Sequence, residues 1–149
     1  MIGAQEKKIR RIMIAAPKSG SGKTMITCGL LQIFKENGED ISSCKCGPDY
    51  IDPMFHREVL SVDSKNLDLF FSEEDILKEG YLKHTKDADI TITEGVMGFY
   101  DGMSLDSVKG SSYDVARTLG LPVILVINAR GAAMTLAAMV KGIAEFRPD

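Results

Sequence analysis

A buried strand that leads directly into a glycine-rich turn and then into a helix constrains the fold of this chain most. Residues 9–16 are rich in β-branched and apolar side chains and end at Pro17, and the turn Ser19-Gly20-Ser21-Gly22-Lys23-Thr24 follows. From Lys23 onward, apolar residues recur at helical spacing as far as Gly38, and glycine is favoured just beyond a helix C-terminus. This order predicts a strand–turn–helix unit in which the turn lies at the carboxyl end of the strand.

The turn has the residues of a phosphate-binding loop. Free backbone N–H groups and the helix dipole attract phosphate at such a junction. Lys23 would reach the β and γ phosphates of ATP, and the Thr24 hydroxyl would ligate Mg²⁺. The usual motif has glycine where this chain has Pro17, but the strand, loop and helix context is retained. We therefore predict nucleotide binding by Ser19, Gly20, Ser21, Gly22, Lys23 and Thr24.

The remaining pattern alternates strands with helices. Further strands are expected at 41–45, 89–93 and 123–128, and helices at 53–60, 72–86, 111–119 and 134–146. Two of these predicted helices, 72–86 and 111–119, begin with capping-box-like pairs, Ser72 with Asp75 and Ser111 with Asp114. The alternation predicts an α/β fold with a mostly parallel sheet that helices cover on both faces.

Composition limits the number of domains and the kinds of partner. A chain of 149 residues with 44% hydrophobic content can bury one core, so we expect one domain. The net charge of −3 and the lack of a basic stripe argue against nucleic acid and membrane surfaces as partners. The apolar stretch 121–127 is too short to span a membrane. Cys28, Cys44 and Cys46 fit a reduced compartment, and Cys44 and Cys46 fit strand packing better than a zinc site. We therefore expect a cytoplasmic protein.

Acidic residues follow two of the predicted strands. Asp49 and Asp52 belong to the run 45–52, and Glu94 ends the strand 89–93. In a parallel sheet these ends open at the same edge as the phosphate-binding turn. Mg²⁺ binds a few carboxylates together with phosphate oxygens, so these side chains could complete the shell that Thr24 begins. The two aspartates could also cap the turn and the helix after Pro53, and the two roles are compatible.

The segment 95–110 contains four glycines and is expected to be the most mobile part of the chain. Asp101 lies there beside Phe99 and Tyr100. These aromatic residues could form a lid over a flat substrate, or the loop could pack back on the sheet. The two histidines, His56 and His84, belong to no pattern that predicts a nucleophilic triad.

Three ordered motifs resemble the cobyrinic acid a,c-diamide synthase family. They cover residues 16–24 around the turn, residues 45–53 with the sequence KCGPDYIDP, and residues 94–102 with the sequence EGVMGFYDG. A later stretch, 121–131, is similar too, although Asn128 stands where the family often has aspartate. The resemblance implies a P-loop NTPase fold related to that of dethiobiotin synthetase.

The same resemblance implies an ATP-dependent amidoligase. ATP would phosphorylate a peripheral carboxylate of a corrinoid, and ammonia from glutamine would displace the phosphate. Lys23 and Thr24 would serve the nucleotide and Mg²⁺. Asp49, Asp52 and Glu94 match acidic positions around the metal and the acyl-phosphate, and Asp101 matches one near the substrate.

The family carries a second, glutaminase-like domain, and the chain corresponds to about its first third. We therefore expect residues 1–149 to be an ATP-binding synthetase domain that is incomplete at its C-terminus and lacks the glutaminase domain. Whether it is active alone stays open. Within the family, a nickel sirohydrochlorin a,c-diamide synthase of coenzyme F430 synthesis would show the same motifs, whereas cobyric acid synthase fits less well.

An alternative of another class is a dimeric ATPase switch of the partitioning type. Lys18 has the spacing of the second lysine in the deviant phosphate-binding loops of such ATPases, where it would reach nucleotide across a homodimer interface. A solvated loop lysine is the simpler interpretation.

Overall fold

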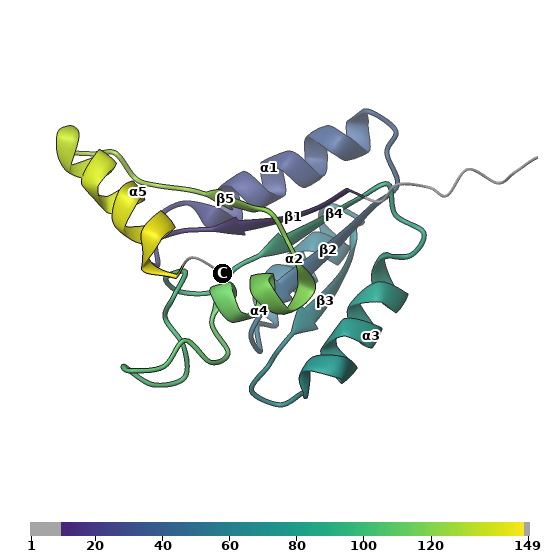
Figure 1. Ribbon diagram of the computed structural model, residues 1–149. Coiled ribbons are helices and arrows are strands. Elements are labelled where there is room, and N and C mark those ends of the chain that lie inside the picture. The colour runs from purple at the N-terminus through teal and green to yellow at the C-terminus, as the bar shows by residue number, and fades with distance from the viewer. Residues whose placement is uncertain (1–9, 148–149) are drawn as a thin grey trace, which may run out of the picture.

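Five parallel strands form the centre of the protein in the computed structural model, which describes residues 10–147 (Figure 1). The strand order is β3-β2-β4-β1-β5. The strands are β1 (Arg10–Ala15), β2 (Ile41–Cys46), β3 (Asp63–Leu67), β4 (Ile90–Glu94) and β5 (Val123–Leu125). All four strand pairs are parallel, which confirms the predicted α/β class.

Helices lie on both faces of this sheet, as predicted. They are α1 (Lys23–Glu36), α2 (Ile51–Glu58), α3 (Glu74–Thr85), α4 (Ser112–Leu119) and α5 (Met134–Phe146). Figure 1 shows α1 on one side of the sheet and α3 and α4 on the other. Side-chain alternation along β1 explains this, because Met13 and Ala15 enter one core cluster while Ile14 enters the other.

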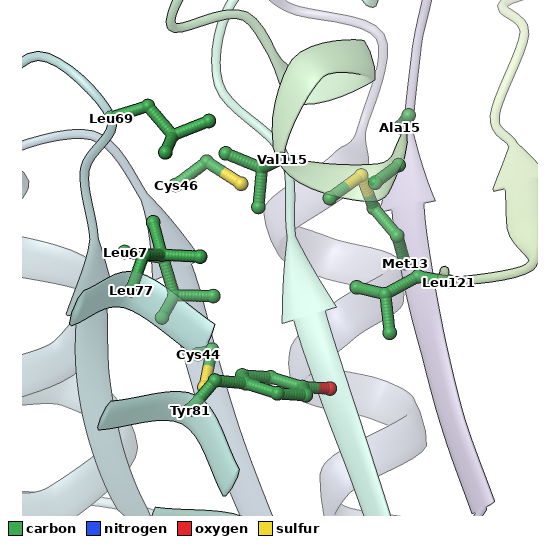
Figure 2. Packing of buried hydrophobic residues seen from close by; sticks show 11 residues of the cluster. Met13, Ala15, Cys44, Cys46, Leu67, Leu69, Leu77, Tyr81, Val115 and Leu121 are labelled. Atoms are coloured by element: carbon green, nitrogen blue, oxygen red, sulfur yellow. The ribbon is translucent and has the colours of Figure 1, made fainter. Parts of the chain in front are cut away.

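The larger core cluster lies between the sheet and the helices α3 and α4. Figure 2 shows Tyr81 and Leu77 of α3 packed beside Cys44 of β2, with Val115 of α4 near Cys46. Both cysteines are fully buried and free, so the expectation of strand packing is confirmed. The second cluster, under α1 and α2, includes Ile14, Leu31, Leu60, Val62 and Ile92.

The last two elements lie at the opposite edge from β3. β5 pairs with β1 over three residues, so it is shorter than the predicted strand 123–128. The helix α5 has the predicted bounds, but none of its residues is buried. It contacts the rest of the protein through Tyr100, whose hydroxyl donates to the Ile143 carbonyl over 2.8 Å and whose ring lies 5.0 Å from that of Phe146.

Several local expectations were wrong. β3 was not predicted, α2 begins at Ile51 instead of Pro53, and α3 begins at Glu74 with Glu73 as its N-cap instead of Ser72. Ser111 does cap α4, since its hydroxyl accepts from the Asp114 N–H over 3.2 Å. The predicted start of the first strand at residue 9 lies outside the described residues.

Among the helices of residues 10–147, none combines the length and the apolarity needed to traverse a bilayer.

Candidate active site

The strand order brings three motifs that are distant in sequence to one edge of the sheet. β4 lies between β1 and β2, so the segments that follow these three strands are neighbours. In the register of the sheet, Glu94 is opposite Lys45 of β2 on one side and Ile14 of β1 on the other. Register partners in a parallel sheet point to the same face. Glu94 and Lys45 therefore both face the layer formed by α1 and α2.

The phosphate-binding turn has the backbone that its glycines predict. Gly20 and Gly22 have φ values of 73° and 97°, in the left-handed region that glycine adopts without steric cost. The Ser21 hydroxyl donates to the Lys18 carbonyl over 2.9 Å and closes the turn. The turn thus presents the start of α1 toward an open cavity.

Lys23 begins α1 and points back across the turn. Its Nζ donates to the Met97 carbonyl over 2.7 Å and to the Lys18 carbonyl over 3.5 Å. Burial and the nearby charge of Lys45 lower the pKa of Lys23, while Glu94 and Asp101 act in the opposite direction. Because both hydrogen-bond acceptors are neutral carbonyls, the ammonium keeps its charge available for an anionic ligand.

Thr24 and Glu94, which lie far apart in the sequence, are in contact. The Thr24 hydroxyl donates to Glu94 Oε1 over 2.5 Å, and Glu94 is fully buried. The second carboxylate oxygen, Oε2, is buried and has no hydrogen-bond partner among residues 10–147. A cavity of about 460 Å³ opens here, and most of the predicted nucleotide-binding residues line it: Ser19, Gly20, Gly22, Lys23 and Thr24, together with Lys45 and Glu94.

Lys45 is the site residue that sequence reasoning missed. Its side chain is 6% exposed, and its Nζ donates to Glu94 Oε1 over 2.9 Å and to Asp52 Oδ2. Asp49 Oδ2 lies 3.7 Å from the same nitrogen. Burial opposes the charge, but Glu94 and Asp52 more than offset that effect and raise the pKa of Lys45. The sequence feature that could have identified Lys45 as a site residue is its position at the start of the run 45–52, which contains Asp49 and Asp52.

Of the two aspartates considered for capping, Asp49 accepts backbone hydrogen bonds in the turn before α2. Asp49 Oδ1 accepts from the backbone N–H groups of Ile51 and Asp52 over 2.9 and 3.2 Å. Asp52 lies in the first turn of α2, where a negative charge is favoured by the helix dipole. The same geometry directs both carboxylates toward Lys45, so capping and a role in the site coexist.

The oxygen-rich donor set fits Mg²⁺ in its chemistry. Thr24, Glu94, Asp52 and Asp49 supply hydroxyl and carboxylate oxygens, and the unpartnered Glu94 Oε2 is a buried acceptor in need of a donor or a cation. In the described part of the chain, however, no three acidic, histidine or cysteine side chains are spaced to hold a metal ion. The carboxylates surround the Lys45 ammonium instead.

Asp101 supports the rim of the cavity. Its Oδ2 accepts from the Gly98 N–H over 2.9 Å, and a Cβ on Gly98 would lie 2.3 Å from that oxygen and 2.6 Å from the Pro17 carbonyl. This close packing fixes the backbone beside Met97, whose carbonyl holds Lys23.

The loop around Asp101 packs back on the sheet. The Phe99 N–H donates to the Ala16 carbonyl over 2.8 Å, and the Phe99 carbonyl accepts from the Tyr113 N–H over 2.9 Å. Phe99 and Tyr100 are half-buried, and their rings contact that of Tyr113 in edge-to-face and tilted arrangements. Of the two alternatives for these aromatic residues, the geometry favours packing on the sheet over an exposed lid.

His56 anchors α2 to the sheet. It is fully buried, and its Nδ1 lies 3.0 Å from the Ser43 hydroxyl and 3.2 Å from the Ser64 hydroxyl. Burial lowers the pKa of His56, which keeps the ring neutral near pH 7. Since Ser43 and Ser64 are themselves buried, this cluster is a structural contact that holds Asp52 in place and not an accessible nucleophile.

Comparisons with known proteins indicate a nucleotide-binding family. The family model described as the CobQ/CobB/MinD/ParA nucleotide binding domain matches residues 12–146. A cobyrinate a,c-diamide synthase of Priestia megaterium is 41% identical over 94% of this chain and 30% of its own length. A hydrogenobyrinate a,c-diamide synthase of Brucella ovis is 44% identical over 95% of this chain and 32% of its own length.

A cobyrinate a,c-diamide synthase of Gloeobacter violaceus is 45% identical over 92% of this chain and 30% of its own length. The chain thus spans about a third of the length of these relatives. The names of the relatives agree with the resemblance drawn from the three motifs, and the matched region contains the turn, Lys45, Asp52 and Glu94. The chain belongs to the CobQ/CobB/MinD/ParA nucleotide binding domain family.

Proposed function

We propose that this chain is the ATP-binding part of a carboxylate-amide ligase that acts on a corrinoid such as cobyrinate or hydrogenobyrinate. The observation that carries the proposal is the meeting of Lys23, Thr24, Lys45 and Glu94 around one cavity, with Asp52 paired to Lys45. The names of the relatives supply the substrate class.

The first step would transfer a phosphoryl group to the substrate. A carboxylate oxygen forms a bond to the γ-phosphorus of ATP, the bond from that phosphorus to the β–γ bridging oxygen breaks, and ADP leaves with the electron pair. Two anions must approach each other, so positive charge is needed between them. Lys23 and Lys45 line the cavity and supply it. Bound Mg²⁺, held by Thr24 and Glu94 with Asp52 and Asp49, would neutralise phosphate charge.

The second step would convert the acyl-phosphate to an amide. The ammonia lone pair forms a bond to the acyl carbon, the carbon–oxygen bond to phosphate breaks, and a proton is lost from nitrogen. A cavity of about 350 Å³ is lined by residues 46–51, among them Asp49, and by Val96, which also lines the nucleotide cavity. It offers room for the carboxylate-bearing edge of a substrate.

Glutamine would supply the ammonia through a separate glutaminase domain. The cysteines of this chain do not suit that reaction. Cys44 and Cys46 are fully buried, and burial raises the pKa of both thiols, to about 12 for Cys46. A thiol in such surroundings forms little of the nucleophilic thiolate at neutral pH.

Two alternatives stay open. A nickel sirohydrochlorin would undergo the same chemistry at the same residues. A dimeric ATPase switch is favoured by one observation: Lys18 is exposed on the turn beside the nucleotide cavity, where it could reach a second copy.

Phosphate release in the presence of MgATP and an ammonium salt tests the proposal. Adding cobyrinate is expected to stimulate release and to yield an amide by mass spectrometry, and hydroxylamine should trap the acyl-phosphate as a hydroxamate. Glu94→Gln should abolish the stimulation, whereas Lys78→Ala, on the exposed face of α3, should leave it unchanged. Phosphate release that ignores every tetrapyrrole carboxylate and instead accompanies ATP-driven dimerisation would favour the switch.

A further inference from the structure

Lys45 occupies the centre of the acidic cluster that was predicted to hold Mg²⁺. Its ammonium contacts Asp52 and Glu94 and lies near Asp49, so one cation is shared by three carboxylates. The exposure of these carboxylates increases outward, from the fully buried Glu94 to the partly exposed Asp52 and Asp49. The Lys45 ammonium therefore occupies the most buried part of the cluster, beside Glu94.

The same oxygen of Glu94 serves both Lys45 and Thr24. Oε1 accepts from Lys45 over 2.9 Å and from Thr24 over 2.5 Å, whereas Oε2 has no partner within residues 10–147. A divalent cation bound between Thr24 and Glu94 would lie beside a buried ammonium of the same sign. Like charges repel strongly where water is excluded. The cluster cannot hold both cations in this arrangement.

Nucleotide phosphate provides a reason for the ammonium to move. Lys45 lines the nucleotide cavity, as Lys23 and Thr24 do, so a phosphate bound at the turn would offer it an alternative anionic partner. A lysine on a flexible four-carbon stem can exchange partners without movement of the backbone. The carboxylates would then be left with uncompensated charge at the moment when the phosphate arrives with its metal.

We propose that Lys45 is a resident counter-cation that keeps the acidic cluster closed to divalent metal until nucleotide binds. Metal and nucleotide then enter as a pair, and neither the tetrapyrrole nor the ammonia source takes part in the exchange. The inference rests on the proposed metal site but not on the identity of the substrate.

Titrations of the 149-residue chain with Mn²⁺ alone test whether Lys45 excludes divalent metal from the cluster. Water-proton relaxation reports the protein-bound ion. The wild-type chain is expected to bind Mn²⁺ weakly. Lys45→Met should bind it at least tenfold more tightly, because the carboxylates lose their internal partner, and its melting temperature should rise when Mg²⁺ is added without nucleotide. Lys45→Arg keeps the charge and should resemble the wild type.

A second titration requires no variant. The wild-type chain should enhance relaxation by Mn²⁺ strongly only after a non-hydrolysable ATP analogue is added, with the metal and analogue alone as the blank. Equal Mn²⁺ affinity of the wild-type chain with and without the analogue would overturn the proposal, as would a folded Lys45→Met that binds the ion no more tightly. If Lys45→Met fails to fold, the wild-type titrations decide. Both are independent of any amidation assay.

Discussion

The charged ammonium of Lys23 donates hydrogen bonds to two neutral acceptors, the carbonyls of Met97 and Lys18. A phosphate would replace these weak contacts with a charge-assisted one. Lys23→Ala is therefore expected to reduce the affinity for MgATP about 10- to 100-fold, the equivalent of one hydrogen bond to a charged group. Titration calorimetry on the variant and the wild-type chain measures this change.

Lys78→Ala is the matched control, because Lys78 lies on α3 in contact with Glu74 and far from the turn in sequence. It should bind MgATP as the wild type does. Unchanged affinity in a folded Lys23→Ala would contradict the assignment of the turn to phosphate binding.

The sequence could reveal only those site residues that occupy a recognisable position in a local motif. Thr24 and Glu94 follow strand ends at a recognisable turn and edge, so their meeting could be predicted. Lys45 could not be assigned, because a lysine near a strand end usually extends to solvent. Its burial results from pairing with Glu94 across two strands that are 49 residues apart in the chain, and no local pattern records that pairing.

At the scale of elements, the start of α4 depends on a side-chain cap and the start of α3 does not. Ser111 Oγ accepts from the Asp114 N–H, whereas Glu73 is the N-cap of α3 and makes no side-chain cap. Ser111→Ala should lower the free energy of unfolding by about 1 kcal/mol. Ser72→Ala, the matched change at the other predicted cap, should alter it by less than about 0.5 kcal/mol.

Urea denaturation of both variants measures the difference between the two helix starts. Equal losses would mean that the hydroxyl of Ser111 does not act as a cap. The comparison also shows what the capping pattern can predict: serine followed three residues later by aspartate occurs at both sites, and only the backbone path into the helix decides whether the hydroxyl is used.

β3 shows why one strand escaped prediction. Its sequence, Asp63-Ser64-Lys65-Asn66-Leu67, is almost wholly polar and lacks β-branched residues. It is a strand because β2 pairs with it along one side and because Ser64 completes the contact of His56 with Ser43. Tertiary pairing, which a local pattern does not contain, overrides its propensity. The inner strands β1, β2 and β4 were predictable because burial on both faces requires apolar or small side chains.

At the scale of the whole molecule, the three thiols report how completely the chain is folded. Cys28 is partly exposed, whereas Cys44 and Cys46 lie under α3 and α4 in the core (Figure 2). A thiol reagent at pH 8 should react with one thiol per folded chain faster than with the other two, and with all three in urea. Cys28→Ser should remove the fast reaction, and rapid modification of all three thiols in the native protein would contradict the packing of the larger core cluster.

The same burial sets the direction of a pH dependence. Unfolded cysteines ionise near pH 8.5, whereas the pKa of Cys46 is raised to about 12 and that of Cys44 is also raised in the folded chain. Above about pH 8.5 the unfolded state therefore holds fewer protons than the folded state, and stability falls as the pH rises. This contribution is absent at neutral pH, where both states keep their thiols protonated.

The central place of β4 links the nucleotide pocket to the stability of the whole sheet. β4 lies between β1 and β2, two strands that precede it in the chain, and its pairing with both brings Thr24, Lys45 and Glu94 together, so a chain in which β4 is unpaired lacks the pocket. A ligand that recognises only the finished sheet draws the population toward it by mass action. Nucleotide bound in this pocket would therefore stabilise the fully paired sheet against unfolding.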